Sequence, residues 1–357
     1  MEKLFQGLHV LDLSTVLAGP SVATFFAELG AEVIKVENPL TRGDVTRSWK
    51  LKTEDEESSV SAYFSSVNFG KTYEWIDYTL PQNRKRLEEL LGWSDIVVVN
   101  FKEGDDTKFS LTAEDVHHIQ PKAIYASLRG FQSNSDRIAY DVVLQAECGF
   151  MFMNGDSSSG PLKMPVALID VIAAHQLKEG ILCALLLREK NKKGLTVRVT
   201  LEEAALSALV NQAGNFLMAG HIAQASGSMH PNIAPYGETF LCSDGKSLVL
   251  AVGSDKQFKQ LCELMGIESV YQEEKYADNQ SRVIHRKDLA LILQRIFATQ
   301  TRDYWMHALI ARGIPSGAIK SMNEVMESKA AQAMLREETI DGKPTKRLST
   351  VAFKLEP

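Results

Sequence analysis

Cysteine is scarce in this sequence and follows no pattern. The 357 residues contain four cysteines, namely Cys148, Cys183, Cys242 and Cys262. They form no C-x-x-C pair and have no histidine at the spacing of a metal site. These features exclude a disulfide scaffold and a thiolate zinc site, and they are typical of thiols in a reducing compartment. We therefore expect a cytoplasmic protein without a bound metal.

Long hydrophobic runs and an excess of positive charge are also missing. No apolar run approaches the roughly 18 residues of a membrane helix, and the N-terminal segment lacks the apolar centre of a signal peptide. With 39 basic and 45 acidic residues, the net charge is −6. This balance argues against nucleic acid or an anionic membrane as the main partner. An anionic ligand would need a local basic cluster.

Two common motifs of α/β enzymes are absent. The turn at residues 14–21 reads Ser-Thr-Val-Leu-Ala-Gly-Pro-Ser, without the G-x-G-x-x-G pattern that cradles a dinucleotide, and Pro20 removes one donor. Glu37 stands where a ribose-binding acid would, but the missing glycine pattern argues more strongly against a dinucleotide site. The sequence also has no G-x-S-x-G, so a serine nucleophile on a hydrolase elbow is not indicated.

Short apolar strands alternate with helices through the first 200 residues. We expect strands at 9–13, 32–37, 95–100, 123–128 and 196–201, with helices at 20–29 and 82–91, and at a capping box from Thr112 to Asp115. Such alternation predicts an α/β fold with a mostly parallel, Rossmann-like sheet. The turn after the first strand should then face a ligand.

The pattern changes in the second half of the chain. An Asp-Gly turn at 244–245 joins apolar segments 238–243 and 246–252, which predicts a β-hairpin. Amphipathic helices are expected at 255–265, 286–299 and 302–312. We therefore predict a large domain over 1–200, a linker helix and connection over 201–237, and a small α+β domain over 238–324. The C-terminal segment, about 325–357, is expected to return to the large domain.

One carboxylate heads the longest apolar helix. Asp170 precedes apolar residues at helical spacing as far as Arg188, so we expect it to be the N-cap, with Gly194 as the C-cap. Most N-cap carboxylates only accept hydrogen bonds from the first turn. The helix dipole at that end would also keep the carboxylate ionised, and an ionised carboxylate can attack an activated acyl group. The pattern alone leaves both roles open.

Several sequence blocks occur in a characteristic order. They are Val10-Leu-Asp-Leu-Ser-Thr-Val-Leu-Ala-Gly-Pro20, Leu29-Gly-Ala-Glu-Val-Ile-Lys-Val-Glu37, Asn68-Phe-Gly-Lys71, Asp95-Ile-Val-Val-Val-Asn-Phe101, Tyr140-Asp-x-x-x-Gln-Ala146, Asp170, and His230-Pro through Pro235-Tyr-Gly. Together they resemble the family III acyl-CoA transferases, which include formyl-CoA transferase, carnitine CoA-transferase and the α-methylacyl-CoA racemases. The resemblance covers residues 5 to about 325.

The resemblance implies a function and an assembly. It implies a large CoA-binding domain, a smaller domain, and a homodimer whose two ring-shaped protomers interlock. Asp170 matches the catalytic aspartate, which would carry CoA between two carboxylic acids through a covalent aspartyl intermediate. The substrates would be an acyl-CoA and a carboxylic acid, with coenzyme A as a substrate part and no tightly bound cofactor.

The resemblance also implies ligand contacts. The segment that runs along the CoA thiol arm and donates backbone N–H groups matches Val16, Leu17 and Ala18. The adenine and pantetheine contacts match Asn100 and Phe101, and Tyr140 matches a residue beside the catalytic aspartate. The residues near phosphate-binding positions are Lys108 and Arg137, with Arg42, Lys71 and Lys102 as further candidates.

Two other functions remain open. The racemase branch uses a histidine where this chain has Tyr140, and a phenol is a poor base at neutral pH. His175 lies five residues along the helix from Asp170, about 140° around its axis. A CoA-binding protein without catalysis is the second alternative. Three departures from the formyl-CoA transferase branch bear on substrate or activity, namely Leu17 for glutamine, Asn38 for arginine, and Gly253-Ser-Asp-Lys-Gln257 for a glycine-rich lid.

Overall fold

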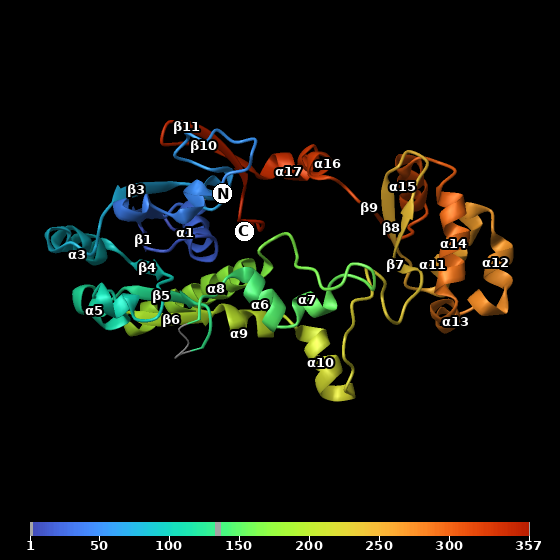
Figure 1. The fold of residues 1–357 in the computed structure, drawn as a ribbon, viewed down its shortest axis with the longest axis horizontal. Helices are drawn as coiled ribbons and strands as arrows, with labels where there is room; N and C mark the ends of the chain where they lie inside the picture. Colours follow the sequence, from blue (N-terminus) through green and yellow to red (C-terminus); the bar gives the residue numbers. More distant parts are fainter. Residues whose placement is uncertain (1–2, 133–136, 357) are drawn as a thin grey trace. The chain divides into compact units, whose positions relative to one another are not determined.

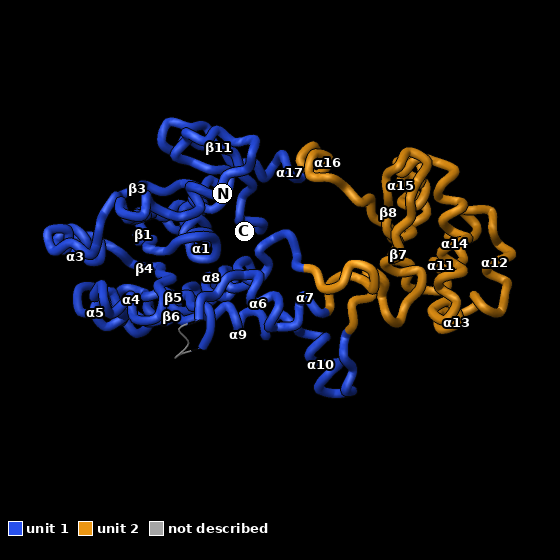
Figure 2. Tube along the Cα trace, viewed as in Figure 1, with its two compact units in different colours: residues 1–152, 163–223, 330–357 blue, residues 153–162, 224–329 orange. Residues whose placement is uncertain are grey.

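The computed structural model describes residues 3–132 and 137–356, and the chain forms two compact units (Figures 1 and 2). The first unit comprises residues 1–152, 163–223 and 330–357, and the second comprises 153–162 and 224–329. The segment 201–237, predicted as a connection, is therefore shared: its first 23 residues, 201–223, belong to the first unit and the rest to the second.

A six-stranded sheet forms the centre of the first unit. Its strands are β1 His9–Asp12, β2 Glu32–Glu37, β3 Lys71–Trp75, β4 Ile96–Val99, β5 Ile124–Arg129 and β6 Leu195–Thr200. They run parallel in the order β3-β2-β1-β4-β5-β6. This is the doubly wound order of a Rossmann-like sheet, whose strand order reverses between β1 and β4. The predicted parallel sheet is confirmed, although β3 was not predicted.

Helices cover both faces of this sheet. Helices α1 (Ala18–Glu28) and α8 (Leu168–Asn191) pack on one face, and α3 (Arg84–Trp93) and α5 (Ala113–Ile119) on the other. Because successive strand residues point to opposite faces, Val10 contributes to the first core and Leu11 to the second, and neither is exposed. A sheet buried on both faces explains why its strands read as continuous apolar runs.

Helix α8 differs at both ends from the expectation. Its N-cap is Ala167, and Asp170 is the third helical residue, so the predicted N-cap role of Asp170 is wrong. The carboxylate of Asp141, from a separate helix, accepts the N–H of Ile169 instead. At the other end, Lys192 adopts a left-handed conformation with φ of 56°. The predicted C-cap at Gly194 is therefore also wrong.

Other predicted helices are present in the structure, but some begin or end at different residues. The capping box of α5 is confirmed. Helix α3 was expected at 82–91 and instead runs from Arg84 to Trp93. The linker helix expected within 201–237 is two helices, α9 (Leu201–Ser207) and α10 (Val210–Ala219).

The first unit is completed by short elements and by the end of the chain. The short elements are η1 Pro39–Thr41, η2 Val45–Ser48, α2 Ala62–Ser66, η3 Pro81–Asn83, α4 Asp105–Lys108, α6 Asp141–Glu147, α7 Phe150–Met153 and α17 Lys329–Met334. A C-terminal hairpin of β10 (Leu335–Ile340) and β11 (Lys343–Leu348) packs near the N-terminal segments in Figure 1. The ion pair of Arg347 with Glu28 attaches it to α1.

The second unit is a small α+β structure. Strands β7 (Tyr236–Leu241), β8 (Ser247–Ala251) and β9 (Ser316–Ala318) are antiparallel, which confirms the predicted hairpin. The helices are α11 Asp255–Met265, α12 Glu268–Gln272, α13 Asn279–Ile284, α14 Arg286–Phe297, α15 Arg302–Ala311 and α16 Met322–Met326, with the short turn η4 Glu274–Tyr276. The three predicted helices correspond to α11, α14 and α15. Across the described parts of the chain, 3–132 and 137–356, no helix combines the length and apolar composition of a membrane span.

The start of α1 provides a test of close packing. A Cβ atom at Gly19 would lie 2.4 Å from both Cβ and Oγ of Ser14. We expect Gly19→Ala to lower the free energy of unfolding by about 1–3 kcal/mol because the turn must shift. Urea denaturation followed by circular dichroism measures this change.

The matched control is Gly92→Ala in α3, where the added Cβ would meet only Ile119 at an ordinary 3.9 Å. Alanine favours helix, so the free energy of unfolding should stay the same or rise by up to about 1 kcal/mol. Equal effects of both substitutions would contradict the packing argument.

Candidate active site

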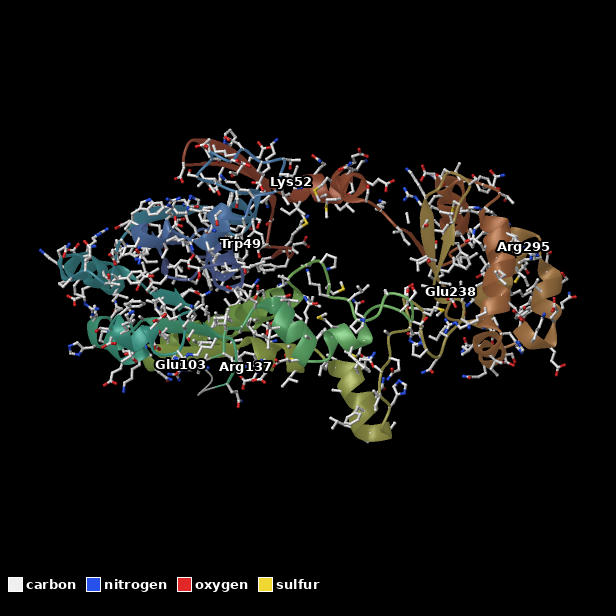
Figure 3. All side chains as sticks on the ribbon, in the orientation of Figure 1. Trp49, Lys52, Glu103, Arg137, Glu238 and Arg295 are labelled. Carbon is white, nitrogen blue, oxygen red and sulfur yellow. The ribbon has the colours of Figure 1, made fainter. Side chains whose placement is uncertain are left out.

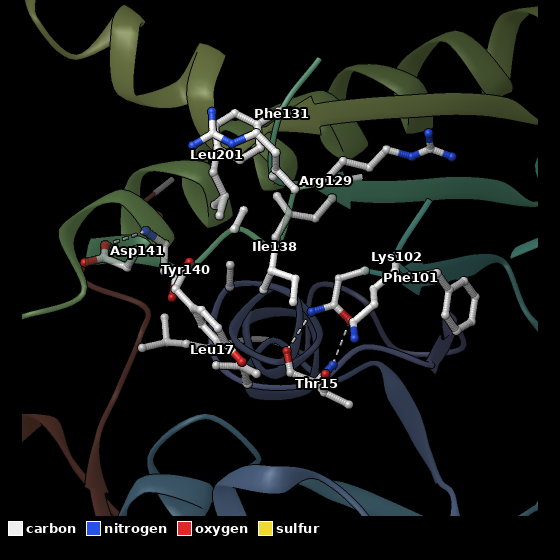
Figure 4. Close-up of a pocket in the computed structure, with 18 of the residues that line it drawn as sticks. Thr15, Leu17, Phe101, Lys102, Arg129, Phe131, Ile138, Tyr140, Asp141 and Leu201 are labelled. Carbon is white, nitrogen blue, oxygen red and sulfur yellow. Dashed lines mark hydrogen bonds between the residues drawn. The ribbon is translucent and has the colours of Figure 1, made fainter. Parts of the chain in front are cut away.

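A cavity of about 430 Å³ lies where β1, β4 and β5 end (Figure 4). Its lining includes residues 15–18 after β1, 100–103 after β4 and 128–131 at the end of β5. Residues 137–141 and Asp170 complete much of the remaining wall. This is the edge of a doubly wound sheet at which ligands bind, next to the reversal of strand order.

The cavity brings together most of the predicted site residues. Its lining includes Val16, Leu17, Ala18, Asn100, Phe101, Arg137, Tyr140 and Asp170. Lys108 is outside this lining; it is exposed on α4, with its ammonium 5.4 Å from the ring centroid of Phe109. The structure therefore does not group Lys108 with the other candidates.

The further basic candidates separate in the same way. Lys102 lines the cavity, whereas Arg42 and Lys71 do not. The ammonium of Lys71 is buried and donates to Asp12 and Asn68, each at 2.8 Å. A side chain with these partners is committed to the interior, so the expectation that Lys71 meets a phosphate is wrong.

Asp170 has an unusual electrostatic environment. The pKa of Asp170 is raised from 3.8 to about 7. Burial is the larger cause, and the negative charge of Asp141 is the second. The sequence pattern predicted that the helix dipole would keep this carboxylate ionised. Desolvation at the third position of α8 and the nearby charge of Asp141 oppose that ionisation.

Asp141 is a residue of the cavity lining that the sequence reasoning did not single out. Its Oδ1 accepts the N–H groups of Ile169 at 2.7 Å and Asp170 at 3.3 Å, and Figure 4 shows this carboxylate beside the cavity. Its Oδ2 accepts from Gln145, whose own oxygen accepts the N–H of Met164. Asp141 and Gln145 thus fix the start of α8. Their i, i+4 spacing within the Tyr140 block was the available signal.

Tyr63 of α2 is a second residue that the sequence reasoning missed. The pKa of Tyr63 is raised to about 12, mainly by burial and then by the charges of Asp170 and Asp141. Its hydroxyl therefore stays protonated at neutral pH and can serve only as a neutral donor or acceptor. No sequence pattern pointed to it.

The aromatic candidates occupy different positions. Tyr140 precedes α6 as its N-cap residue and is 54% exposed, so it is available to a ligand and is not part of the core. Phe101 packs edge-on against Tyr78 and Phe109, with ring centroids 6.4 and 5.9 Å apart.

Asn100 has a defined partner in the structure. Its amide accepts the N–H of Thr15 at 3.0 Å and donates to the Thr15 carbonyl at 2.8 Å, shown as two dashed lines in Figure 4. This pairing joins the end of β4 to the turn after β1. Because both the oxygen and the nitrogen of this amide bind Thr15, the side chain of Asn100 holds the turn in place.

Charged side chains of both signs border the cavity. Arg129 pairs with Glu103 and Asp106, and Arg137 pairs with Glu147 and lies 4.4 Å from the Phe131 ring centroid. Glu103 and Arg137 are labelled in Figure 3. Ion pairs that face solvent contribute little free energy of stabilisation, so an anionic ligand can compete for these guanidinium groups. Among residues 3–132 and 137–356, no cluster of three or more histidine, cysteine or carboxylate side chains could hold a metal ion.

The departures noted in the sequence have local structural roles. Asn38 accepts the N–H of Leu40 at 2.9 Å and so caps the turn η1. In the second unit, the Gln257 side chain accepts the N–H of Gly253 at 2.9 Å. His175 is exposed on α8 and is outside the cavity lining.

The fold is that of a doubly wound α/β protein, with a carboxylate in the cavity at the reversal of strand order, where proteins of this class bind their ligands. The family model described as CoA-transferase family III matches residues 5–356. The chain belongs to this family, and two of its relatives below are named as CoA-transferases.

Two named relatives and one solved structure illustrate the similarity. The succinate–glutarate CoA-transferase of Agrobacterium fabrum is 33% identical over 92% of this chain and 82% of its own length. The succinyl-CoA:glutarate CoA-transferase of Mus musculus is 33% identical over 90% of this chain and 73% of its own. The crystal structure of a CAIB/BAIF family protein from Brucella suis has a TM-score of 0.86 and 33% identity, covering 98% of this chain and 92% of that one.

The electrostatic coupling of the two carboxylates is testable. We expect Asp141→Asn to lower the pKa of Asp170 below about 7, because a neighbouring negative charge is removed. The pKa should remain above the ordinary value near 4, because burial, the larger cause, is unchanged. Carbon-13 NMR titration of the aspartate carboxyl groups measures this shift.

Glu103→Gln is the matched control, since it neutralises another carboxylate of the same cavity that does not contribute to the shift at Asp170. It should leave the pKa of Asp170 unchanged. An unchanged or higher pKa in Asp141→Asn would contradict the proposed coupling.

Proposed function

We propose that this CoA-transferase moves CoA between two carboxylic acids through a covalent intermediate on Asp170. The observation that supports the proposal is the shared cavity. It places the Asp170 carboxylate in one lining with Leu17 and Ala18 at the start of α1. A nucleophile and the backbone N–H groups of a helix start are the two components that acyl transfer needs.

The proposed chemistry retains one activated acyl bond, a thioester or an anhydride, at every stage. The Asp170 carboxylate attacks the thioester carbonyl, forming a mixed anhydride and releasing CoA as a thiolate. The thiolate attacks the aspartyl carbonyl of the anhydride, which forms an aspartyl-CoA thioester and releases the donor acid as a carboxylate. The acceptor carboxylate then runs the same two steps in reverse and leaves as its CoA thioester. Asp170 returns as a free carboxylate.

The raised pKa of Asp170 fits this role. At neutral pH the ionised, nucleophilic form is present beside the protonated form, because the pKa is about 7. Helix geometry leaves the N–H groups of Leu17 and Ala18 without an intrahelical acceptor. These donors would stabilise the negative charge that develops on the acyl oxygen.

Succinyl-CoA and glutarate are the first substrates to test. Two relatives are named for succinate or succinyl-CoA with glutarate. Leu17 gives the cavity an apolar side chain where the formyl-CoA transferase branch has glutamine, which fits an acyl group larger than that of formate. The phosphates of CoA would be met by cations of the cavity lining such as Lys102 and Arg129.

The homodimer is part of the proposal. Helix α10 exposes large apolar side chains, with Val210 at 72%, Leu217 at 77% and Met218 at 88% exposure. A monomer seldom exposes such a group on one helix, so we propose that a second copy covers it, in the interlocked arrangement of the family. We expect light scattering after gel filtration to give a dimer for the wild type and a monomer for Leu217→Lys. A monomeric wild type would contradict this assembly.

Two alternatives predict different products. Racemisation at the α-carbon would exchange the α-proton with solvent without moving CoA. A non-catalytic CoA-binding protein would bind the thioester and leave it unchanged. Tyr140 in the position of the racemase histidine disfavours the first, and the half-buried carboxylate of Asp170 in the cavity lining disfavours the second.

Hydroxylamine trapping tests the intermediate. We expect incubation with succinyl-CoA and hydroxylamine to convert Asp170 into a hydroxamate, detected by peptide mass spectrometry, and Asp170→Asn to show neither the adduct nor CoA transfer to glutarate. Glu179→Gln, an exposed carboxylate on the same helix, is the control and should be trapped like the wild type.

Transfer of CoA by Asp170→Asn at the wild-type rate would contradict the covalent route. Deuterium uptake at the α-carbon without CoA transfer would instead identify an isomerase.

A further inference from the structure

The turn after β1 contains a residue in an unfavourable backbone conformation. Val16 has φ of 74°, in the left-handed region. A β-branched side chain is a rare occupant of that region, because Cβ approaches the following carbonyl oxygen. Such a conformation persists only where surrounding groups hold it, and it often occurs at functional sites. Val16 lies in the cavity lining immediately before Leu17 and Ala18.

The carboxylate of Asp44 holds this residue. Its two oxygens lie 3.2 and 3.1 Å from the N atom of Val16, and both accept the N–H. The same carboxylate accepts from the backbone and hydroxyl of Thr46 at 3.0 and 2.8 Å. Asp44 therefore connects the start of η2 with the cavity turn, 28 residues earlier in the chain.

Asp44 is held by the buried ammonium group of Lys35 and by a backbone hydrogen bond to Glu37. The ammonium of Lys35 lies 3.2 Å from Asp44 and donates to the Ser14 carbonyl at 2.6 Å. The side chains of Lys35 and Asp44 have no exposed surface. Glu37 accepts the N–H of Asp44 at 2.8 Å. One buried ammonium thus holds both the carboxylate and the turn that the carboxylate orients.

Each residue before the α1 start has its own contact. Ser14 donates its N–H to Asp12 at 3.0 Å, Thr15 pairs with Asn100, and Val16 donates to Asp44. The Val16 N–H is therefore occupied and is not available to an acyl oxygen. The donors that remain at the helix start are those of Leu17 and Ala18.

We infer that Asp44, held by Lys35, is a positioning residue that keeps Val16 left-handed and thereby aims the N–H groups of Leu17 and Ala18 at the acyl group on Asp170. This inference rests on the proposed function. Asp44 touches no substrate in this scheme; it acts through the backbone of Val16. A purely structural role would instead make Asp44 important only for folding through its contacts with Lys35 and Thr46.

Substitutions at Asp44 separate these roles. We expect Asp44→Ala to slow CoA release from succinyl-CoA in a single turnover by about 100-fold, the usual effect of misplacing one oxyanion donor. The affinity for free CoA should change little. Asp44→Asn keeps an oxygen acceptor for Val16, so it should restore most of the rate.

The background of Val16→Gly provides the decisive comparison. Glycine adopts positive φ without strain, so it does not need the Asp44 contact to stay left-handed. In this background we expect Asp44→Ala to slow CoA release by less than about 10-fold, whereas it slows release by about 100-fold with Val16 present. An equal cost in both backgrounds would overturn the inference.

A measurement on the wild type covers the case in which Asp44→Ala does not fold. Amide hydrogen exchange read by NMR should show the Val16 amide protected in the free protein. The amides of Leu17 and Ala18 should become protected only after succinyl-CoA is added. An unprotected Val16 amide would overturn the inference.

Failure of the proposed function has a different signature. The wild type would then give no hydroxamate at Asp170 and no CoA transfer, although Val16 could still be protected. If only the inference fails, the wild type would still transfer CoA and form the hydroxamate at Asp170. Asp44→Ala would then slow CoA release equally in both backgrounds.

Discussion

A group of buried charges at the end of β1 supports the structure of the cavity. The ammonium groups of Lys35 and Lys71 lie 3.7 and 2.8 Å from Asp12, and none of the three side chains is exposed. Burial alone would raise the pKa of Asp12, but the charges of Lys35 and Lys71 lower it to about 2. Removing one member would leave a buried charge unpaired, at a cost of about 3–5 kcal/mol. The strained turn and the start of α1 both depend on this pairing.

The catalytic candidate is held in the opposite electrostatic state. Asp170 is half-buried, and desolvation together with a like charge raises its pKa from 3.8 to about 7. Because the folded pKa is raised, its favourable contribution to stability is fully present below about pH 3.8 and is lost as the pH rises through about 7. Oppositely charged groups pair in the frame, whereas Asp170 has a like charge beside it. Asp141 serves both purposes, since it caps α8 and opposes ionisation of Asp170.

Prediction succeeded where the pattern was local and regular. Apolar strands such as Ile96–Val99 and the Asp244–Gly245 hairpin were found because each carries its signal within a few residues. Helix ends were placed less well. Asp170 satisfies every local rule for an N-cap, yet Asp141 provides that hydrogen bond from 28 residues earlier. Lys71 was a candidate for binding the CoA phosphates, but its partner Asp12 lies 59 residues away in the sequence. No window of sequence contains both members of such pairs.

The sequence by itself determined the alternation of strands and helices, the family resemblance and the acid that heads the longest helix. These follow from periodicity, turn chemistry and ordered motifs, which are properties of neighbouring residues. Only the tertiary structure decided the ionisation of Asp170, the partner of Asn100 and the conformation of Val16. Each depends on desolvation or on hydrogen bonds between segments far apart in the chain, and distance and burial come into existence only when the chain is folded.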